Sequence, residues 1–103
     1  MNVISPRGLA SLAKPHADAR VPLADWLKTA QSARWTCLVD VKKSFGSADQ
    51  VGACLAFNIK GNTYRLIATV VWADQHQGGT LFVKHFLTHA EYDKNTWKGC
   101  CDL

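Results

Sequence analysis

The apolar residues in the first half of the chain recur at the spacing of α-helices. Leu9, Leu12 and Ala13 fall on one face of a short segment. This first helix is predicted to begin at about Pro6 and to end before Pro15, because proline fits a first helical turn but not a helix interior.

A second, longer helix follows, and Asp18 is its expected N-terminal cap. Its apolar residues recur at helical spacing as far as about Ala33, at Leu23, Trp26, Leu27 and Ala30. Residues 36–45 are predicted to form a third, short helix, which the sequence FGSAD ends.

From Val51 onward the apolar period changes to two, which is typical of a half-buried β-strand. The alternating residues are Leu55, Phe57 and Ile59, and the turn after them consists of Lys60, Gly61 and Asn62. Residues 63–72 are rich in β-branched and aromatic side chains, which predicts an antiparallel hairpin. A third long strand is expected over residues 81–87, and a short helical turn over residues 88–94.

This order of elements predicts an α+β fold. N-terminal helices are expected to pack on one face of a twisted antiparallel sheet of three to four strands. The opposite face would then be free for a ligand. A chain of 103 residues suits a single domain over residues 1–103.

Composition adds a weak indication of the partner. Twelve Lys and Arg against eight Asp and Glu give a net charge of +4, which slightly favours a polyanion such as nucleic acid. The chain has neither the apolar run of a signal peptide nor a stretch approaching the roughly 20 apolar residues of a membrane span. We therefore expect a cytoplasmic protein without a membrane partner.

The cysteines show no metal-binding spacing. They are Cys37, Cys54, Cys100 and Cys101, and they form neither a CxxC pair nor a Cys/His quartet. Free thiols and no structural metal are predicted.

Three polar clusters interrupt the apolar pattern of the second half. They comprise Lys60, Asn62 and Arg65; Lys84 and His85; and His89, Glu91, Tyr92, Asp93 and Lys94. Antiparallel pairing would bring them together. Cleavage of RNA by its own 2′-OH needs a base, a cation for the phosphate charge and an acid for the leaving 5′-oxygen, and these residue types supply all three.

Each candidate also has a structural interpretation. His89 could transfer protons near neutral pH or simply cap a surface turn, and Arg65 could bind phosphate or form a salt bridge. Tyr92 could stack on a base or cover the core, and Asp93 could orient a neighbouring cation or cap a helix. Lysines could guide RNA by long-range charge or form an ordinary solvated face; these are Lys42, Lys43 and Lys84.

Two motifs carry a resemblance to a known family. FNIKGNTYRLI at residues 57–67 and THAEYDK at residues 88–94 look like motifs of the HigB-type toxins of bacterial toxin-antitoxin systems. Weaker similarity extends through VIS, PLADW and FGSAD over most of the chain. An arginine often stands in relatives at the position of Lys84, and lysine there lacks the bidentate fork.

The resemblance implies a RelE-like fold and a ribosome-dependent endoribonuclease that cleaves messenger RNA without a cofactor. The implied partner is a helix-turn-helix antitoxin of the HigA type, and operator DNA would be bound only through it. For the cleavage site the resemblance nominates His89 and Arg65 most firmly, with Lys60, Tyr92 and Lys94 in support and Asp93 in an orienting role. Asn62, Lys84, Lys42 and Lys43 are the candidates for RNA binding.

Two other functions stay open at this point. The same fold could host a gyrase-directed or other protein-targeting toxin, or a decayed homologue that binds RNA or antitoxin without cleavage. The sequence leaves undecided the codon preference, the general base, the antitoxin-binding surface, the oligomeric state and the role of Cys100 and Cys101.

Overall fold

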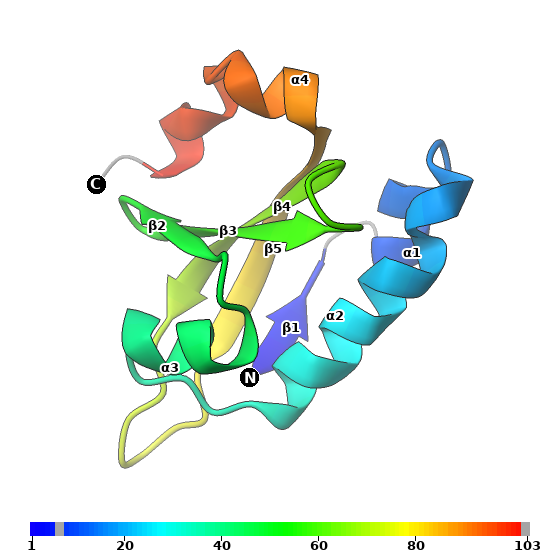
Figure 1. The fold of residues 1–103 in the computed structure, drawn as a ribbon. Helices are drawn as coiled ribbons and strands as arrows, with labels where there is room; N and C mark the ends of the chain where they lie inside the picture. Colours follow the sequence, from blue (N-terminus) through cyan, green and yellow to red (C-terminus); the bar gives the residue numbers. More distant parts are fainter. Residues whose placement is uncertain (6–7, 102–103) are drawn as a thin grey trace.

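The computed structural model describes residues 1–5 and 8–101, with the side chains of Cys100 and Cys101 outside the described part. One short strand and then a run of helices form the first part of the chain, and strands dominate its centre (Figure 1). In chain order the elements are β1 (Asn2–Ile4), α1 (Leu9–Ala13), η1 (Ala17–Ala19), α2 (Arg20–Ser32), α3 (Leu38–Ser44), β2 (Asp49–Val51), β3 (Cys54–Ile59), β4 (Tyr64–Val71), β5 (Thr80–Thr88), α4 (His89–Asp93) and η2 (Thr96–Cys101), where η denotes a 3-10 helix.

A five-stranded sheet in the order β1-β5-β4-β3-β2 forms the centre of the fold. The predicted hairpin of β3 and β4 is confirmed, with Ile59 opposite Tyr64 across the turn. The sheet has one strand more than predicted and is mixed, because β1 pairs in parallel with β5 while the other pairs are antiparallel. The α+β class is confirmed.

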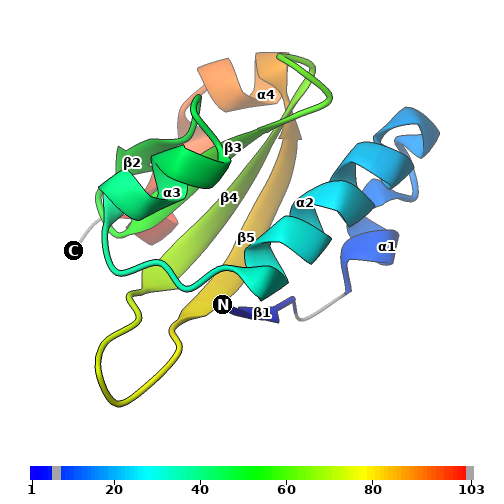
Figure 2. The ribbon, with the colours of Figure 1, turned by 60° about the horizontal axis from the view of Figure 1, so that its bottom comes forward.

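The helical layer packs on one face of the sheet, as Figure 2 shows for α1 and α2. Its core includes Trp26 of α2, whose ring centroid is 5.2 Å from that of Phe57 in β3. Both side chains are fully buried, so this contact joins the two layers. The predicted beginning of the first helix at Pro6 lies outside the described residues.

The prediction that β3 is half-buried is wrong. Cys54 and Ala56 are as buried as the alternating Leu55 and Phe57, because a second apolar cluster covers the opposite face. Trp97 of η2 belongs to this cluster, and Tyr92 of α4 packs against it. The face predicted to be free for a ligand is therefore partly covered by the C-terminal helices.

The prediction of free thiols is wrong for Cys54. Cys54 is disulfide-bonded. Its Sγ lies 3.9 Å from the hydroxyl of Thr69, its partner in the β3–β4 register. Cys37, which precedes α3, is a free and exposed thiol.

Candidate functional site

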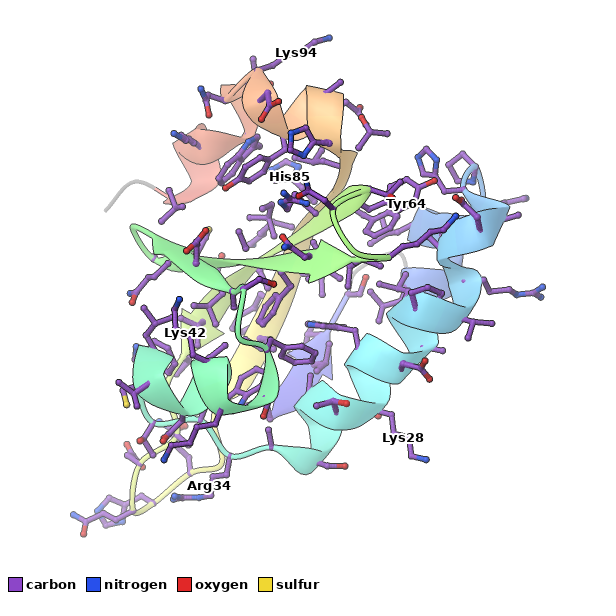
Figure 3. The ribbon with its side chains drawn as sticks, viewed as in Figure 1. Lys28, Arg34, Lys42, Tyr64, His85 and Lys94 are labelled. Atoms are coloured by element: carbon purple, nitrogen blue, oxygen red, sulfur yellow. The ribbon has the colours of Figure 1, made fainter. Side chains whose placement is uncertain are left out.

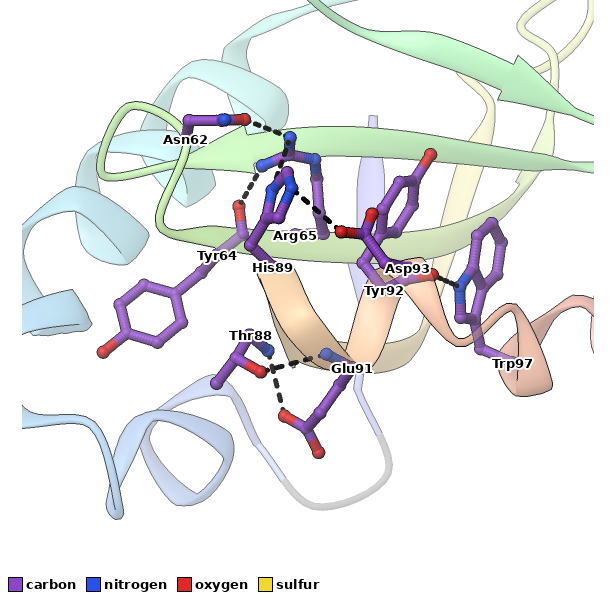
Figure 4. Close-up of polar contacts among 9 residues, drawn as sticks. All are labelled: Asn62, Tyr64, Arg65, Thr88, His89, Glu91, Tyr92, Asp93 and Trp97. Atoms are coloured by element: carbon purple, nitrogen blue, oxygen red, sulfur yellow. Dashed lines mark hydrogen bonds and ion pairs between the residues drawn. The ribbon is translucent and has the colours of Figure 1, made fainter.

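The hairpin turn and the beginning of α4 bring five of the predicted site residues together. Asn62 and Arg65 come from the β3–β4 hairpin, and α4 contributes His89, Tyr92 and Asp93 (Figure 4). The two segments adjoin because β4 and β5 pair antiparallel, with Tyr64 opposite Thr88. We call these five residues the hairpin–α4 site.

Arg65 is the centre of the hairpin–α4 site and is only 9% exposed. Its Nη1 donates to the carbonyl oxygen of Tyr64 at 3.1 Å, and its Nη2 donates to Oδ1 of Asn62. The guanidinium carbon lies 5.2 Å from the ring centroid of Tyr92. Within the described part of the chain Arg65 forms no ion pair. The alternative interpretation of Arg65, a salt bridge on the sheet face, is thus not found there.

His89 lies between the guanidinium of Arg65 and the carboxylate of Asp93. Its Nδ1 is 3.4 Å from Nη2 of Arg65, and its Nε2 is 3.1 Å from Oδ2 of Asp93. A neutral imidazole with its proton on Nε2 satisfies both contacts, because Nε2–H donates to Asp93 while Nδ1 accepts from Arg65. The side chain is 44% exposed and is therefore accessible to a ligand.

A capping box fixes the beginning of α4, which places His89 at its first position. The hydroxyl of Thr88 accepts from the backbone N–H of Glu91 at 3.2 Å, and the Glu91 carboxylate accepts from the backbone N–H of Thr88 at 3.0 Å. The Thr-x-x-Glu spacing of the sequence produces this pair of hydrogen bonds. Hydrogen bonding of the Glu91 carboxylate, first to the backbone N–H of Thr88 and then to its side chain, lowers the pKa of Glu91.

The aromatic pair of Tyr92 and Trp97 joins α4 to η2. The rings of Tyr92 and Trp97 stack with centroids 5.0 Å apart, and the indole N–H of Trp97 donates to the Tyr92 carbonyl oxygen at 2.8 Å. Tyr92 therefore covers the second apolar cluster with one face and contacts Arg65 with the other. The two interpretations of this tyrosine, covering the core and contributing to the site, are compatible.

The structure places Lys60 on the other side of the hairpin turn. Its Nζ lies 2.6 Å from Oδ2 of Asp18, and Oδ1 of Asp18 accepts from the hydroxyl of Tyr64 at 2.6 Å. The prediction that Asp18 caps the second helix is therefore wrong. Ala19 precedes Arg20 at the N-cap position, and no side-chain cap is present. The carboxylate turns instead toward two donors on the hairpin.

Among the described residues, the side chains of the remaining predicted lysines form no hydrogen bond or ion pair with the hairpin–α4 site. Lys94 points outward from the end of α4 (Figure 3), and Lys84 is the exposed residue of β5 left unpaired where the register with β4 shifts. Lys42 and Lys43 lie on α3, which packs on the helix-covered face, and Lys43 is 3.8 Å from Asp40.

Two further histidines lie near the hairpin–α4 site: His16, which gave no signal in the sequence, and His85, which belongs to the Lys84 and His85 cluster noted in the sequence. The ring of His16 is 4.9 Å from that of Tyr64, and the charge of His16 contributes to the lowered pKa of Glu91. His85 is half-buried on β5, and burial followed by the charge of Lys84 lowers its pKa. No spacing rule could find His16, because tertiary packing alone brings it to the hairpin.

The described residues contain no group of three or more His, Cys, Asp or Glu side chains suited to a metal ion. No described helix is long and apolar enough to cross a bilayer.

The helix-covered sheet and its Arg-His-Asp cluster define a small α+β domain with a polar site at one end. Residues 19–95 match the HigB toxin family, the RelE-like toxic component of a toxin-antitoxin system. The chain belongs to this family, which confirms the resemblance and implies an antitoxin as partner. A search of curated proteins found no match.

Proposed function

We propose that this toxin is a ribosome-dependent endoribonuclease that cleaves messenger RNA at the hairpin–α4 site. Its neutralising partner would be a helix-turn-helix antitoxin. Family membership supports the toxin class. The chemistry of the hairpin–α4 site supports the substrate.

One observation carries the proposal, namely a nearly buried guanidinium that lacks a carboxylate partner among the described residues. A cation withdrawn from water is costly unless an anion compensates it. A phosphate group is such an anion, and its geometry fits the fork of arginine. The 3.4 Å contact between Arg65 and His89 is at the long end of the hydrogen-bond range, so a phosphate could replace it easily.

In the proposed reaction the 2′-oxygen loses its proton to a base and attacks the adjacent phosphorus. The bond from phosphorus to the 5′-oxygen breaks, and that oxygen takes a proton from an acid. The products are a 2′,3′-cyclic phosphate and a free 5′-hydroxyl. The protein and the RNA together supply every atom and proton that these steps require.

We assign a task in this reaction to each residue according to its contacts. His89 is the proton-transfer group, and Asp93 holds its ring through Nε2. Arg65 stabilises the charge that develops on the phosphate, and Asn62 fixes the guanidinium. Tyr92 offers a supporting contact. Lys60 and Lys94 are assigned to RNA binding around the hairpin–α4 site, because neither touches His89 or Arg65.

The test is 5′-end mapping of a defined messenger RNA on translating ribosomes, with wild type and His89→Ala protein. Cuts at in-frame codons that vanish in the folded variant are the expected result. His76→Ala is the matched control, because His76 lies exposed in the β4–β5 connection, away from the hairpin–α4 site. Full cleavage by His89→Ala would remove His89 from the mechanism.

Two further outcomes would decide against a nuclease. Intact messenger RNA together with DNA damage during growth arrest would indicate a gyrase-directed or other protein-targeting toxin. Binding to programmed ribosomes without cleavage would indicate a decayed homologue.

A further inference from the structure

We propose that Asp18 is a positioning residue of the hairpin–α4 site, because its carboxylate fixes the turn that carries Asn62 and Arg65. This inference rests on the proposed nuclease function. It also goes beyond family membership, since the matched range begins at residue 19.

Asp18 holds the hairpin at both ends of its turn. One carboxylate oxygen contacts Lys60, which directly follows β3, and the other accepts from Tyr64, which begins β4. Lys60 and Gly61 both have positive φ values, 55° and 60°. A lysine rarely adopts this left-handed conformation. The ion pair with Asp18 therefore stabilises Lys60 in its left-handed conformation.

The opposite side of the same turn holds the catalytic groups. The carbonyl oxygen of Thr63 accepts from the backbone N–H of His89 at 3.0 Å. The carbonyl of Tyr64 and the side chain of Asn62 accept from Arg65. A displacement of the turn thus moves acceptors of both Arg65 and His89.

The position of Asp18 is fixed by the packing of the neighbouring residues. It belongs to η1, and the preceding His16 packs its ring against Tyr64 and Phe86, with centroids 4.9 Å and 6.1 Å away. The hydrogen bonds from Lys60 and then Tyr64 lower the pKa of Asp18, which favours the ionised carboxylate that both donors contact. The helical layer therefore determines where the hairpin turn lies.

The experiment compares Asp18→Ala with Asp25→Ala, which removes an exposed carboxylate of α2 that contacts no described donor. The first measurement is the single-turnover cleavage rate at saturating protein on programmed ribosomes, with the ribosome affinity measured separately. Asp18→Ala is expected to slow cleavage at least about tenfold at unchanged affinity, because small displacements of reacting groups are costly. Asp25→Ala should match the wild type.

The second measurement is the nitrogen NMR signals of the His89 ring and the Arg65 guanidinium, which need no substrate. Asp18→Ala should shift both sets, and Asp25→Ala should shift neither. Wild-type cleavage rate and unshifted signals in Asp18→Ala would overturn the inference. If the wild type cleaves no RNA, the proposed function fails, and the NMR signals still decide whether Asp18 positions Arg65 and His89.

Tyr64→Phe provides a milder variant if Asp18→Ala does not fold. It removes one of the two contacts and should slow cleavage in the same direction. In the double variant Asp18→Ala/Tyr64→Phe the two effects should not add, because both changes break the same link. Full additivity would overturn the inference.

Discussion

Arg65→Met is predicted to slow cleavage roughly 10²–10³-fold while leaving the free energy of unfolding close to that of the wild type. Methionine has a similar length and retains an apolar contact with the ring of Tyr92. It removes the charge and every hydrogen bond of the guanidinium. The variant therefore separates a role in phosphate binding from a role in folding.

The structure allows the expected change in stability to be worked out. The variant loses the charge-assisted hydrogen bonds to Tyr64 and Asn62, each contributing about 1.5–3 kcal/mol, together with the 3.4 Å contact to His89 at the long end of the hydrogen-bond range. It also removes the desolvation cost of a nearly buried cation, which is several kcal/mol. The cation–π contact of about 0.5–2 kcal/mol is replaced by a sulfur–aromatic contact of about 0.3–1.5 kcal/mol. These contributions cancel to within roughly 2 kcal/mol.

Activity should respond very differently. Loss of a preorganised donor to a developing oxyanion costs roughly 10²–10³ in rate. Arg65→Lys should recover little of it, because lysine keeps the charge but cannot contact Asn62 and a phosphate in the same fork. The assays are urea denaturation and cleavage on programmed ribosomes.

Two results would refute this reasoning. A decrease in the free energy of unfolding above about 3 kcal/mol would show that Arg65 mainly holds the fold together. Wild-type cleavage by a folded Arg65→Met protein would show that the guanidinium does not stabilise the reacting phosphate.

Three further predictions concern the fold and its pH dependence. Trp26→Ala should lower the free energy of unfolding by about 3–5 kcal/mol. Trp26→Phe should lower it far less, because the indole N–H has no partner among the described residues. Chemical denaturation checks both variants. Thr88→Ala should cost about 1 kcal/mol and speed amide exchange at Glu91, and unchanged exchange would contradict the capping box. The pKa of His85 is lowered in the folded state, so the unfolded state binds its proton first as the pH falls, and stability should decrease below about pH 6.5. Lys84→Met should weaken this pH dependence. Equal slopes of melting temperature against pH in the wild type and the variant would argue against it.

Local sequence patterns were sufficient for the longer elements of the fold. The period of two around Leu55 and Phe57 predicted β3, and Lys60 to Asn62 correctly marked the turn. The two short strands β1 and β2 were missed, because three residues carry too little periodicity and β1 depends on a partner from the far end of the chain.

The candidate site was predictable only where strand register decides the contacts. Antiparallel pairing of β4 and β5 explains why Arg65 and His89 meet. Register cannot tell where a turn side chain points, so the ion pair between Lys60 and Asp18 was not foreseen. The favourable position of Asp18 before a helix suggested a cap, but two donors on the hairpin compete more effectively for its carboxylate.

The parallel pairing of β1 with β5 sets an order of assembly for the chain. Asn2 is paired with Thr80, so the first strand made during synthesis waits for the last strand before it can join the sheet. The β3–β4 hairpin needs only a short loop closure and can form much earlier. During synthesis this edge of the sheet is therefore completed only after β5 has been made. The segment that carries His89 is the next part of the chain to follow.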